Sequence, residues 1–300
     1  MSGGTPSATG TAAPASAFRA DLLRGKVAFV AGGTSGINLA IAEALARHGA
    51  AVAVMSRSAE KVERAVAQLR ALGATAQGGA GDVRRYDEVE GVMTAAHRAL
   101  GPLDIVVSGA AGNFLCPAEQ LSPNGFRTVV EIDLLGTFHV LRCARGLARA
   151  PGASFLNVSA PQSTQAYWGQ AHVSAAKAGV DMLTRSLAVE WGPAGIRVNA
   201  IVPGPIGGTE GIDRLAPTEA IRDAWTATNP LRRFGTGREV ADVALFLCSE
   251  AAAYVNGSVV YCDGGQVLAS ARDYRASWEA TARSREAGAP ATTLNGSQEG

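Results

Sequence analysis

The sequence predicts an α/β fold in which a doubly wound parallel sheet carries helices on both faces. Two observations lead to this prediction. Short runs rich in β-branched residues alternate with longer stretches of helical periodicity, an order of elements typical of parallel sheets. The first run leads through a glycine-rich segment directly into a helical stretch, as strands do in doubly wound folds. With 300 residues, 47% of them hydrophobic, the chain can bury one large core, so a single domain is expected.

The expected strands are short and the expected helices are longer. The strands are placed at residues 27–30, 51–55, 105–107, 154–158, 197–201 and 259–261, with another just before Gly81. The helices include residues 37–48, 59–72, 86–100, 125–148, 170–191 and 237–248. Crossovers between parallel strands are nearly always right-handed, which leaves a doubly wound sheet as the economical topology.

The two ends of the chain differ from its middle in composition. Residues 1–20 are mostly Ser, Gly, Thr, Ala and Pro and lack the continuous apolar stretch of a signal peptide, so a disordered leader is expected. Residues 271–300 are similarly polar and are expected to form a flexible tail. The folded domain is therefore assigned to residues 21–270.

Charge and composition argue against several classes of partner. The formal net charge is +1 and the isoelectric point is near 7.7, so no bulk charge attracts nucleic acid or an anionic membrane. No run is long and apolar enough to cross a bilayer. The four histidines lack metal-ligand spacing, and no metal site is expected. Four cysteines without a C-x-x-C motif favour reduced, buried thiols in the cytosol. They are Cys116, Cys143, Cys248 and Cys262.

A glycine-rich turn over residues 32–38 follows the first expected strand. Glycines at such a turn let backbone amides approach a pyrophosphate, and the following helix N-terminus adds positive potential. With a strand before it and a helix after it, the turn predicts nucleotide binding in a Rossmann-type domain. The alternative is an ordinary tight turn. Asn38 stands where a final glycine is usual, a departure expected to alter helix packing beside the phosphates.

The residues after the next two expected strands bear on which nucleotide binds. An acidic residue after the second strand would hydrogen-bond the ribose hydroxyls of NAD, whereas Ser56 leaves room and Arg57 offers a cation to a 2′-phosphate. This pattern favours NADP(H), unless Arg57 is only a solvated surface charge. Asp82 either accepts a hydrogen bond from the adenine amino group or caps the next helix.

Lys177 is one of only three lysines among 27 basic residues. It lies in an expected helix four residues before Asp181, a spacing that puts the ammonium and the carboxylate on one face. The pair is either an ordinary helix salt bridge or part of a functional site.

Further motifs follow in a consistent order. After the glycine turn come Asp82 and Val83, the lysine helix, the run 197–206 and the run 262–265. Together they resemble the short-chain dehydrogenase/reductase family over roughly residues 22–268. In that family the lysine holds ribose hydroxyls of the cofactor, which the resemblance implies for Lys177.

The sequence departs from that family's usual catalytic pattern. Most members place a tyrosine four residues before the lysine as proton donor and a serine seventeen residues before it; here those positions are Val173 and Ala160. The usual Asn-Asn-Ala-Gly is replaced at residues 108–111, and Asp133 replaces the asparagine of the fourth helix. Ordinary carbonyl reduction has therefore lost its acid.

Four segments narrow the resemblance to the 2,4-dienoyl-CoA reductases, and among these to the peroxisomal type, which also lacks the tyrosine. They are residues 110–117, 133–138, 190–193 and 203–211. This resemblance implies NADPH-dependent reduction of a 2,4-dienoyl-CoA or related enoyl thioester to a 3-enoyl-CoA, in unsaturated fatty acid β-oxidation. Conjugate hydride addition creates a dienolate whose oxygen needs mainly hydrogen bonds, so a missing tyrosine is tolerable.

Residue roles follow from this expectation. Hydride goes to the δ carbon, Asn113 donates to the thioester oxygen, and water held by Lys177 and Asp181 protonates the α carbon. Asp133 either anchors Lys177 through water or is a polar residue at a helix bend, and Asn113 is alternatively a turn residue after Gly112. The expected catalytic residues are Lys177, Asp181, Asn113 and Asp133. The expected cofactor contacts are Gly32, Thr34, Ser35, Gly36, Ile37, Ser56, Arg57, Asp82, Val83, Ala110, Lys177, Pro203, Gly204 and Ile206. The expected substrate contacts are Asn113, Phe114, Tyr167 and Trp168.

Two other functions stay open. The chain could be a carbonyl reductase with an atypical acid such as Tyr167, or a non-catalytic NADP-binding sensor or scaffold. Residues 207–233 suit a lid over the cofactor and substrate. Relatives imply a homotetramer, for which the apolar positions in residues 180–189 are compatible. Residues 297–300 lack a peroxisomal Ser-Lys-Leu address, so a cytoplasmic protein is expected.

Overall fold

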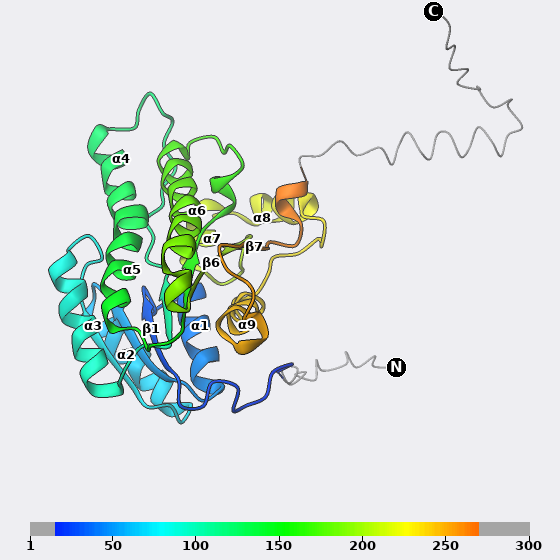
Figure 1. Cartoon of the computed structure of the whole chain (residues 1–300). Helices are drawn as coiled ribbons and strands as arrows, with labels where there is room; N and C mark the ends of the chain where they lie inside the picture. Colours follow the sequence, from blue (N-terminus) through cyan, green and yellow to red (C-terminus); the bar gives the residue numbers. More distant parts are fainter. Residues whose placement is uncertain (1–15, 270–300) are drawn as a thin grey trace, which may run out of the picture.

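Seven parallel strands in the order β3-β2-β1-β4-β5-β6-β7 form the centre of the molecule, with helices on both sides (Figure 1). The computed structural model describes residues 16–269. The strands are β1 (Val27–Ala31), β2 (Ala51–Ser56), β3 (Ala76–Ala80), β4 (Ile105–Ser108), β5 (Ala153–Val158), β6 (Ile196–Pro203) and β7 (Val259–Cys262). The α-helices are α1 (Gly36–Arg47), α2 (Ala59–Ala71), α3 (Tyr86–Leu100), α4 (Pro123–Val130), α5 (Gly136–Leu147), α6 (Ala171–Trp191), α7 (Glu210–Leu215), α8 (Glu219–Thr228) and α9 (Gly237–Cys248). This topology confirms the predicted doubly wound fold.

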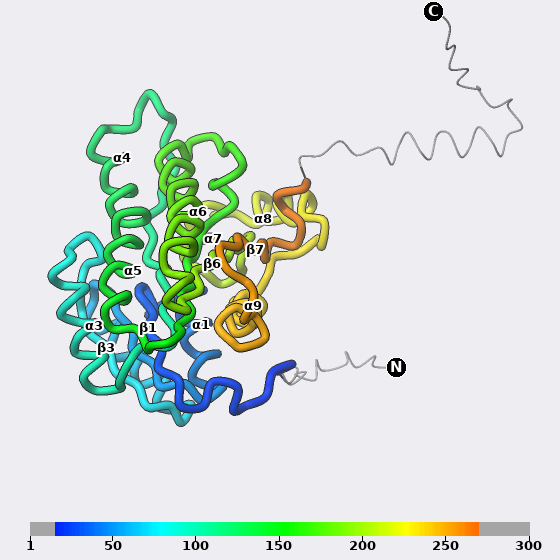
Figure 2. Tube along the Cα trace, viewed as in Figure 1, coloured from blue at the N-terminus to red at the C-terminus, as the bar shows by residue number. Residues whose placement is uncertain are grey.

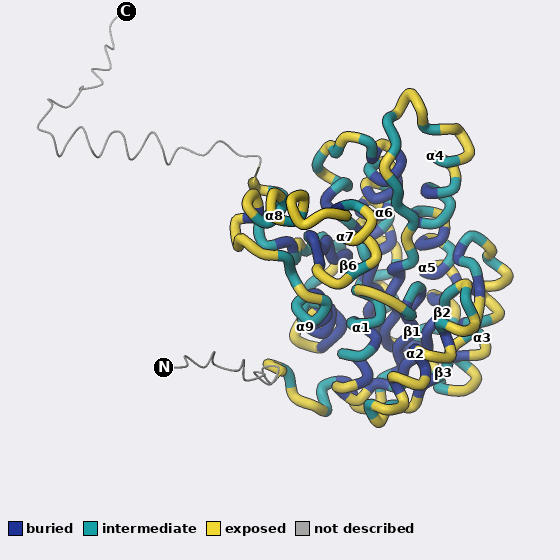
Figure 3. The backbone as a smooth tube through the Cα atoms, turned by 180° about the vertical axis from the view of Figure 1, so that it is seen from behind, coloured by how far each residue is buried: buried dark blue, intermediate teal, exposed yellow. Residues whose placement is uncertain are grey.

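The sheet buries both of its faces, because alternate side chains of each strand point to opposite sides. On β1, Ala28 and Val30 pack with residues of α1, α2 and α9 in one apolar cluster. Val27, Phe29 and Ala31 pack with residues of α3, α5 and α6 in a second cluster. Figure 3 shows the buried strands between the outer, more exposed helices. Burial on both sides explains why the strands read as nearly continuous apolar runs.

Two features of the helices were not predicted. The expected helix at 125–148 is divided into α4 and α5 by a π-helical turn, Glu131–Leu135, whose wider hydrogen-bonding pattern includes Asp133. The expected lid contains α7, which was missed, as well as the polar helix α8 (Figure 2). Single-turn π segments are frequent at functional sites, which draws attention to Asp133.

The last residues of the expected leader, 16–20, lie within the described chain, and some of them contact the folded domain. Phe18 packs against the core and meets the His48 ring edge to face at 6.2 Å, and Ser16 Oγ lies 3.0 Å from His48 Nε2. The rest of the expected leader and the whole of the expected tail lie outside the described residues. Within the described chain, no helix is both long and apolar enough to span a membrane.

The cysteines are free, and their burial differs from expectation. Cys143 and Cys248 are buried, whereas Cys116 and Cys262 are only half-buried. Burial raises the pKa of the Cys248 thiol to about 12, which keeps that thiol protonated and inert.

Candidate active site

The candidate site lies at the carboxyl edge of the sheet, where all parallel strands end. β1 pairs with β2 on one side and with β4 on the other, so the strand order reverses between β1 and β4. Ligands of doubly wound folds bind in the crevice at such a reversal. The glycine turn after β1 and the segment after β4 therefore meet at this point.

The glycine turn has the geometry that a dinucleotide phosphate requires. Gly32 and Gly36 have φ values of +78° and +54°, which side chains disfavour. A Cβ at Gly32 would lie 2.9 Å from the Ala110 amide nitrogen, so the close approach of the two loops needs glycine. Ser35 begins α1 without a side-chain capping bond. The first amides of α1 are thus available to a phosphate, and the residues present fit a nucleotide cofactor.

Asn38 and Gly109 form one complementary contact across this crevice. Asn38 Nδ2 donates to the Gly109 carbonyl over 2.7 Å. A Cβ at position 109 would overlap Asn38 Oδ1, so only glycine fits there while residue 38 is asparagine. The two departures from the family pattern, Asn38 and Gly109, are therefore linked. The side chain of Asn38 occupies the space that a side chain at position 109 would need.

The adenosine end of the expected site is strongly charged. Arg57 is exposed just before Ser58, whose side chain caps α2 by accepting from the Lys61 amide at 3.2 Å. Hydrogen bonds from Arg84 hold the pKa of the Asp82 carboxyl below its ordinary value. The alternative role for Asp82, as cap of the next helix, is wrong because Arg85 occupies that position. Val83 is buried against Gly136.

Lys177 and Asp133 form a buried ion pair at the centre of the site. Lys177 Nζ lies 3.3 Å from Asp133 Oδ2 and donates to the Val158 carbonyl at 2.9 Å, and the two side chains are only 6% and 1% exposed. Asp133 Oδ1 accepts from the Gly112 amide at 2.7 Å. Asp133 thus anchors Lys177 directly, rather than through water, and also fixes the start of the segment that carries Asn113.

The alternative of an ordinary helix salt bridge between Lys177 and Asp181 is wrong, because Lys177 pairs with Asp133. Helical side chains lean toward the helix N-terminus, and the ammonium of Lys177 extends that way to the ends of β5 and the π-helical turn. Asp181 is 3% exposed, and both of its carboxylate oxygens lack a hydrogen-bond partner within the structure. A buried carboxylate in this state requires water or a ligand nearby.

Asn113 and Phe114 lie in the irregular segment between β4 and α4. Asn113 Oδ1 is buried and has no hydrogen-bond partner among the described residues. The Phe114 ring packs on the His172 ring with centroids 4.4 Å apart. His172 is fully buried, and neither of its ring nitrogens has a hydrogen-bond partner among the described residues. Burial lowers the pKa of this imidazole, which favours its neutral form.

Tyr167 and Trp168 are placed differently from each other. The Tyr167 hydroxyl donates to Gln165 Oε1 at 3.2 Å and accepts from Gln266 Nε2 at 3.4 Å. Burial raises the pKa of Tyr167, which makes it a weaker acid than free tyrosine. Trp168 is 79% exposed and does not line an enclosed pocket. The position of the family's usual tyrosine, Val173, is buried among apolar neighbours.

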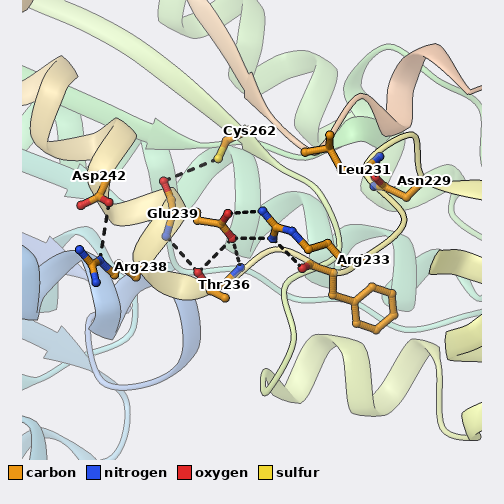
Figure 4. A network of polar contacts seen from close by, with 9 residues as sticks. Asn229, Leu231, Arg233, Thr236, Arg238, Glu239, Asp242 and Cys262 are labelled. Carbon is orange, nitrogen blue, oxygen red and sulfur yellow. Dashed lines mark hydrogen bonds and ion pairs between the residues drawn. The ribbon is translucent and has the colours of Figure 1, made fainter. Parts of the chain in front are cut away.

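The run after β6 approaches the chain after β7 closely. A Cβ at Gly204 would lie 2.7 Å from the Asp263 Cα, and Ile206 is buried. A pocket of about 430 Å³ lies behind this run, away from Lys177. Glu239 lines this pocket, and its carboxylate accepts two hydrogen bonds from Arg233 (Figure 4). The same carboxylate forms a capping box with Thr236 at the start of α9. Pro203 ends β6 itself.

Sequence reasoning missed Arg214 altogether. The guanidinium of this α7 residue donates to the Asn113 carbonyl at 3.0 Å. No local pattern could reveal the contact, because the two residues are distant in the chain. Among the described residues, no group of His, Cys, Asp and Glu is arranged to hold a metal ion.

Comparison with known proteins agrees with this geometry. A family model described as enoyl-(acyl carrier protein) reductase matches residues 31–266. The chain belongs to the short-chain dehydrogenase/reductase family. Like the family in general, this short-chain dehydrogenase/reductase requires a nicotinamide cofactor for hydride chemistry.

Relatives of this short-chain dehydrogenase/reductase include dienoyl-CoA reductases. A peroxisomal 2,4-dienoyl-CoA reductase, (3E)-enoyl-CoA-producing, from Arabidopsis thaliana is 45% identical over 267 residues, covering 86% of this chain and 89% of that protein. A relative from Bacillus subtilis strain 168, named a probable 2,4-dienoyl-CoA reductase, (2E)-enoyl-CoA-producing, is 40% identical and covers 81% of this chain and 97% of its own. A crystal structure of a short chain dehydrogenase from Bacillus anthracis matches with a TM-score of 0.74 and 36% identity, covering 83% of this chain and all of that one (100%).

Proposed function

We propose that this protein reduces 2,4-dienoyl-CoA thioesters with NADPH to 3-enoyl-CoA products. The observation that carries the proposal is the buried Lys177–Asp133 pair. The positions of the family's usual catalytic tyrosine and serine are occupied by Val173 and Ala160. Ketone reduction needs a proton on oxygen as hydride arrives, whereas conjugate reduction needs only hydrogen bonds to that oxygen. The dienoyl-CoA reductases among the relatives support the same reaction.

The bound cofactor supplies hydride to the δ carbon of the dienoyl group. Asn113 donates from its side-chain amide to the thioester oxygen and stabilises the dienolate charge that develops there. This role is supported by the firmly held segment around Asn113, where the Gly112 amide donates to Asp133 and the Phe114 carbonyl accepts from Gln170. Phe114 and Tyr167 flank the acyl group in this proposal.

The proton that completes the reaction comes from water at the α carbon. An ammonium has three donors; Lys177 directs one of them to the Val158 carbonyl and forms an ion pair of 3.3 Å with Asp133. We assign a remaining donor to a ribose hydroxyl or to a water. Asp181 supplies two unpartnered carboxylate oxygens one helical turn away, so a water held between Lys177 and Asp181 would have the partners that a buried water needs.

NADPH is proposed over NADH because the chain after β2 lacks an acidic residue. Arg57 is exposed and free to approach a 2′-phosphate, and Ser56 leaves space for it. Exchange of Arg57 for alanine should raise the KM for NADPH by about tenfold and change the KM for NADH little, because only NADPH carries the extra phosphate.

The alternative of a carbonyl reductase using Tyr167 is less well supported. Its hydroxyl is occupied by Gln165 and Gln266, and burial raises its pKa. Ketone reduction abolished by Tyr167→Phe and spared by Asn113→Ala would establish that alternative. Tight NADPH binding without oxidation by any substrate would instead establish the sensor function.

The decisive experiment is an NADPH oxidation assay with 2,4-dienoyl-CoA thioesters of several chain lengths. Wild-type protein should turn over, and Lys177→Ala and Asp181→Asn should each lower kcat by about 100-fold or more, as for removal of a general acid–base group. NMR of the product locates the remaining double bond at carbon 3 or carbon 2. No turnover at any chain length would refute the proposed function.

We also propose a cytoplasmic homotetramer. Four free cysteines suit a reducing compartment. Exposed apolar side chains gather on α5, α6 and the adjoining π-helical turn, and we call this surface the α5–α6 face. It consists of Leu135, Phe138, Met182 and Val189, which are 41%, 40%, 58% and 78% exposed. Val180, Leu187 and Ala188, also expected at an interface, lie instead in the monomer's core.

A further inference from the structure

The segment that carries Asn113 has no regular secondary structure between β4 and α4, so tertiary contacts must hold it. Asp133 accepts from the Gly112 amide. The Phe114 carbonyl accepts from Gln170 Nε2 at 2.8 Å. These two contacts come from the π-helical turn and the start of α6, and they fix the backbone on both sides of Asn113.

Arg214 provides the contact at Asn113 itself. Its Nη1 donates to the Asn113 carbonyl at 3.0 Å, from the short helix α7 that follows β6. A guanidinium donor makes a stronger hydrogen bond than a neutral group because it is charged. The bond restrains the peptide of Asn113, and with it the direction of the side-chain amide.

The helix that carries Arg214 is itself held in place. Thr209 caps α7, and its methyl carbon would lie 3.7 Å from a Cβ at Gly36 in the phosphate turn. Glu210 forms an ion pair of 3.3 Å with Lys61 on α2. Arg222 of α8 donates to the Ala216 carbonyl and to Asp213, which fixes the other end. α7 therefore spans the crevice from the cofactor side to the Asn113 segment.

We propose that Arg214 is a positioning residue for the reaction, which sets the orientation of Asn113 toward the thioester oxygen when α7 lies over the crevice. The inference rests on the role of Asn113 in the proposed function. In this role Arg214 places the hydrogen bond that Asn113 donates in the transition state, and it does not contribute to NADPH binding. Small misplacement of such a donor has large kinetic effects.

Steady-state kinetics of five variants, two single exchanges with their double variant and two controls, test this assignment. Arg214→Gln should lower kcat for a 2,4-dienoyl-CoA by roughly 10- to 100-fold with an unchanged Kd for NADPH. In an Asn113→Ala background the same exchange should change kcat by less than about twofold, because its effect passes through the missing amide. Arg222→Gln loosens the far end of α7 without touching Asn113, and Arg64→Gln on α2 removes a surface arginine elsewhere.

Each outcome bears on the assignment. Wild-type kcat in Arg214→Gln, or an equal loss in the Asn113→Ala background, would overturn it. An equal kcat loss in Arg222→Gln would show that general loosening of α7 suffices and would also overturn it. Partial recovery of Arg214→Gln by added guanidinium ion supports it.

A measurement independent of turnover separates this inference from the proposed function. Hydrogen–deuterium exchange over residues 109–117 should be faster in Arg214→Gln than in wild type and unchanged in Arg64→Gln. If the wild type fails to oxidise NADPH, the proposed function falls, and so does the catalytic part of this inference. The exchange result then still decides whether Arg214 orders the segment, and unchanged exchange would refute that contact.

Discussion

Lys177 shows at the residue scale what local sequence can and cannot predict. The shortage of lysine and the helix position predict a functional role for this residue, and Asp133 is among the expected site residues. The direct contact between them was not predicted, because four-residue spacing favours Asp181 while the ion-pair partner in the structure comes from another helical segment. Burying two charges is favourable only with such a close partner and additional hydrogen bonds, which a sequence does not display.

The contact between Asn38 and Gly109 leads to a prediction at the same scale. Gly109→Ala places a methyl group against Asn38 and should destabilise the protein by about 1–3 kcal/mol, as overpacking does. Adding Asn38→Gly removes the obstruction and should recover part of the loss. Urea unfolding of the wild type, both single variants and the double variant measures the coupling. Strictly additive changes would contradict the idea of a complementary pair.

Most elements of the sheet were predictable because the strands other than β3 are short, largely apolar runs followed by a turn. All seven expected strands are present, with small shifts of their ends. The π-helical turn was not predictable, since Glu131–Leu135 contains neither glycine nor proline to mark it. α7 was missed because six residues give too little periodicity to recognise a helix.

The capping network of α9 predicts a pH dependence at the element scale. Hydrogen bonds from Arg233 in the first place, and then from Thr236, lower the pKa of Glu239 from 4.5 to about 2. A carboxyl with a depressed folded-state pKa adds stability above its unfolded pKa and loses that contribution as pH falls toward the folded value. Glu239→Gln should therefore lower Tm at pH 7. The accompanying loss in the free energy of unfolding should be less than about 1 kcal/mol, because the pair is exposed.

The difference in Tm between wild type and Glu239→Gln should shrink as pH falls from about 4.5 to about 2. Thermal unfolding across this range follows the trend, with Glu60→Gln on α2 as a control for an exposed ion pair outside the network. A Tm difference that stays constant over the range would contradict the assignment.

At the scale of the whole molecule, the α5–α6 face predicts assembly. Met182→Glu together with Val189→Glu places charges on this surface and should convert a tetramer to dimers or monomers, because buried unpaired charges oppose association. Size-exclusion chromatography with light scattering measures the mass. Ala71→Glu on α2 is a control, since it adds one such charge at an exposed site outside this face. A wild-type monomer, or an unchanged tetramer in the double variant, would refute the proposal.

The π-helical turn also keeps α4 and α5 close to one rotational phase. Its hydrogen bonds close over five residues instead of four, so Glu131–Leu135 turns the chain about as far as four residues of an α-helix and accommodates one extra residue. Removing one residue here would allow an uninterrupted α-helix, but it would close the wider turn from which Asp133 reaches Lys177. The length of this short stretch is therefore as strict a requirement as its residue types, and deletions here should be far less tolerated than substitutions at its exposed positions.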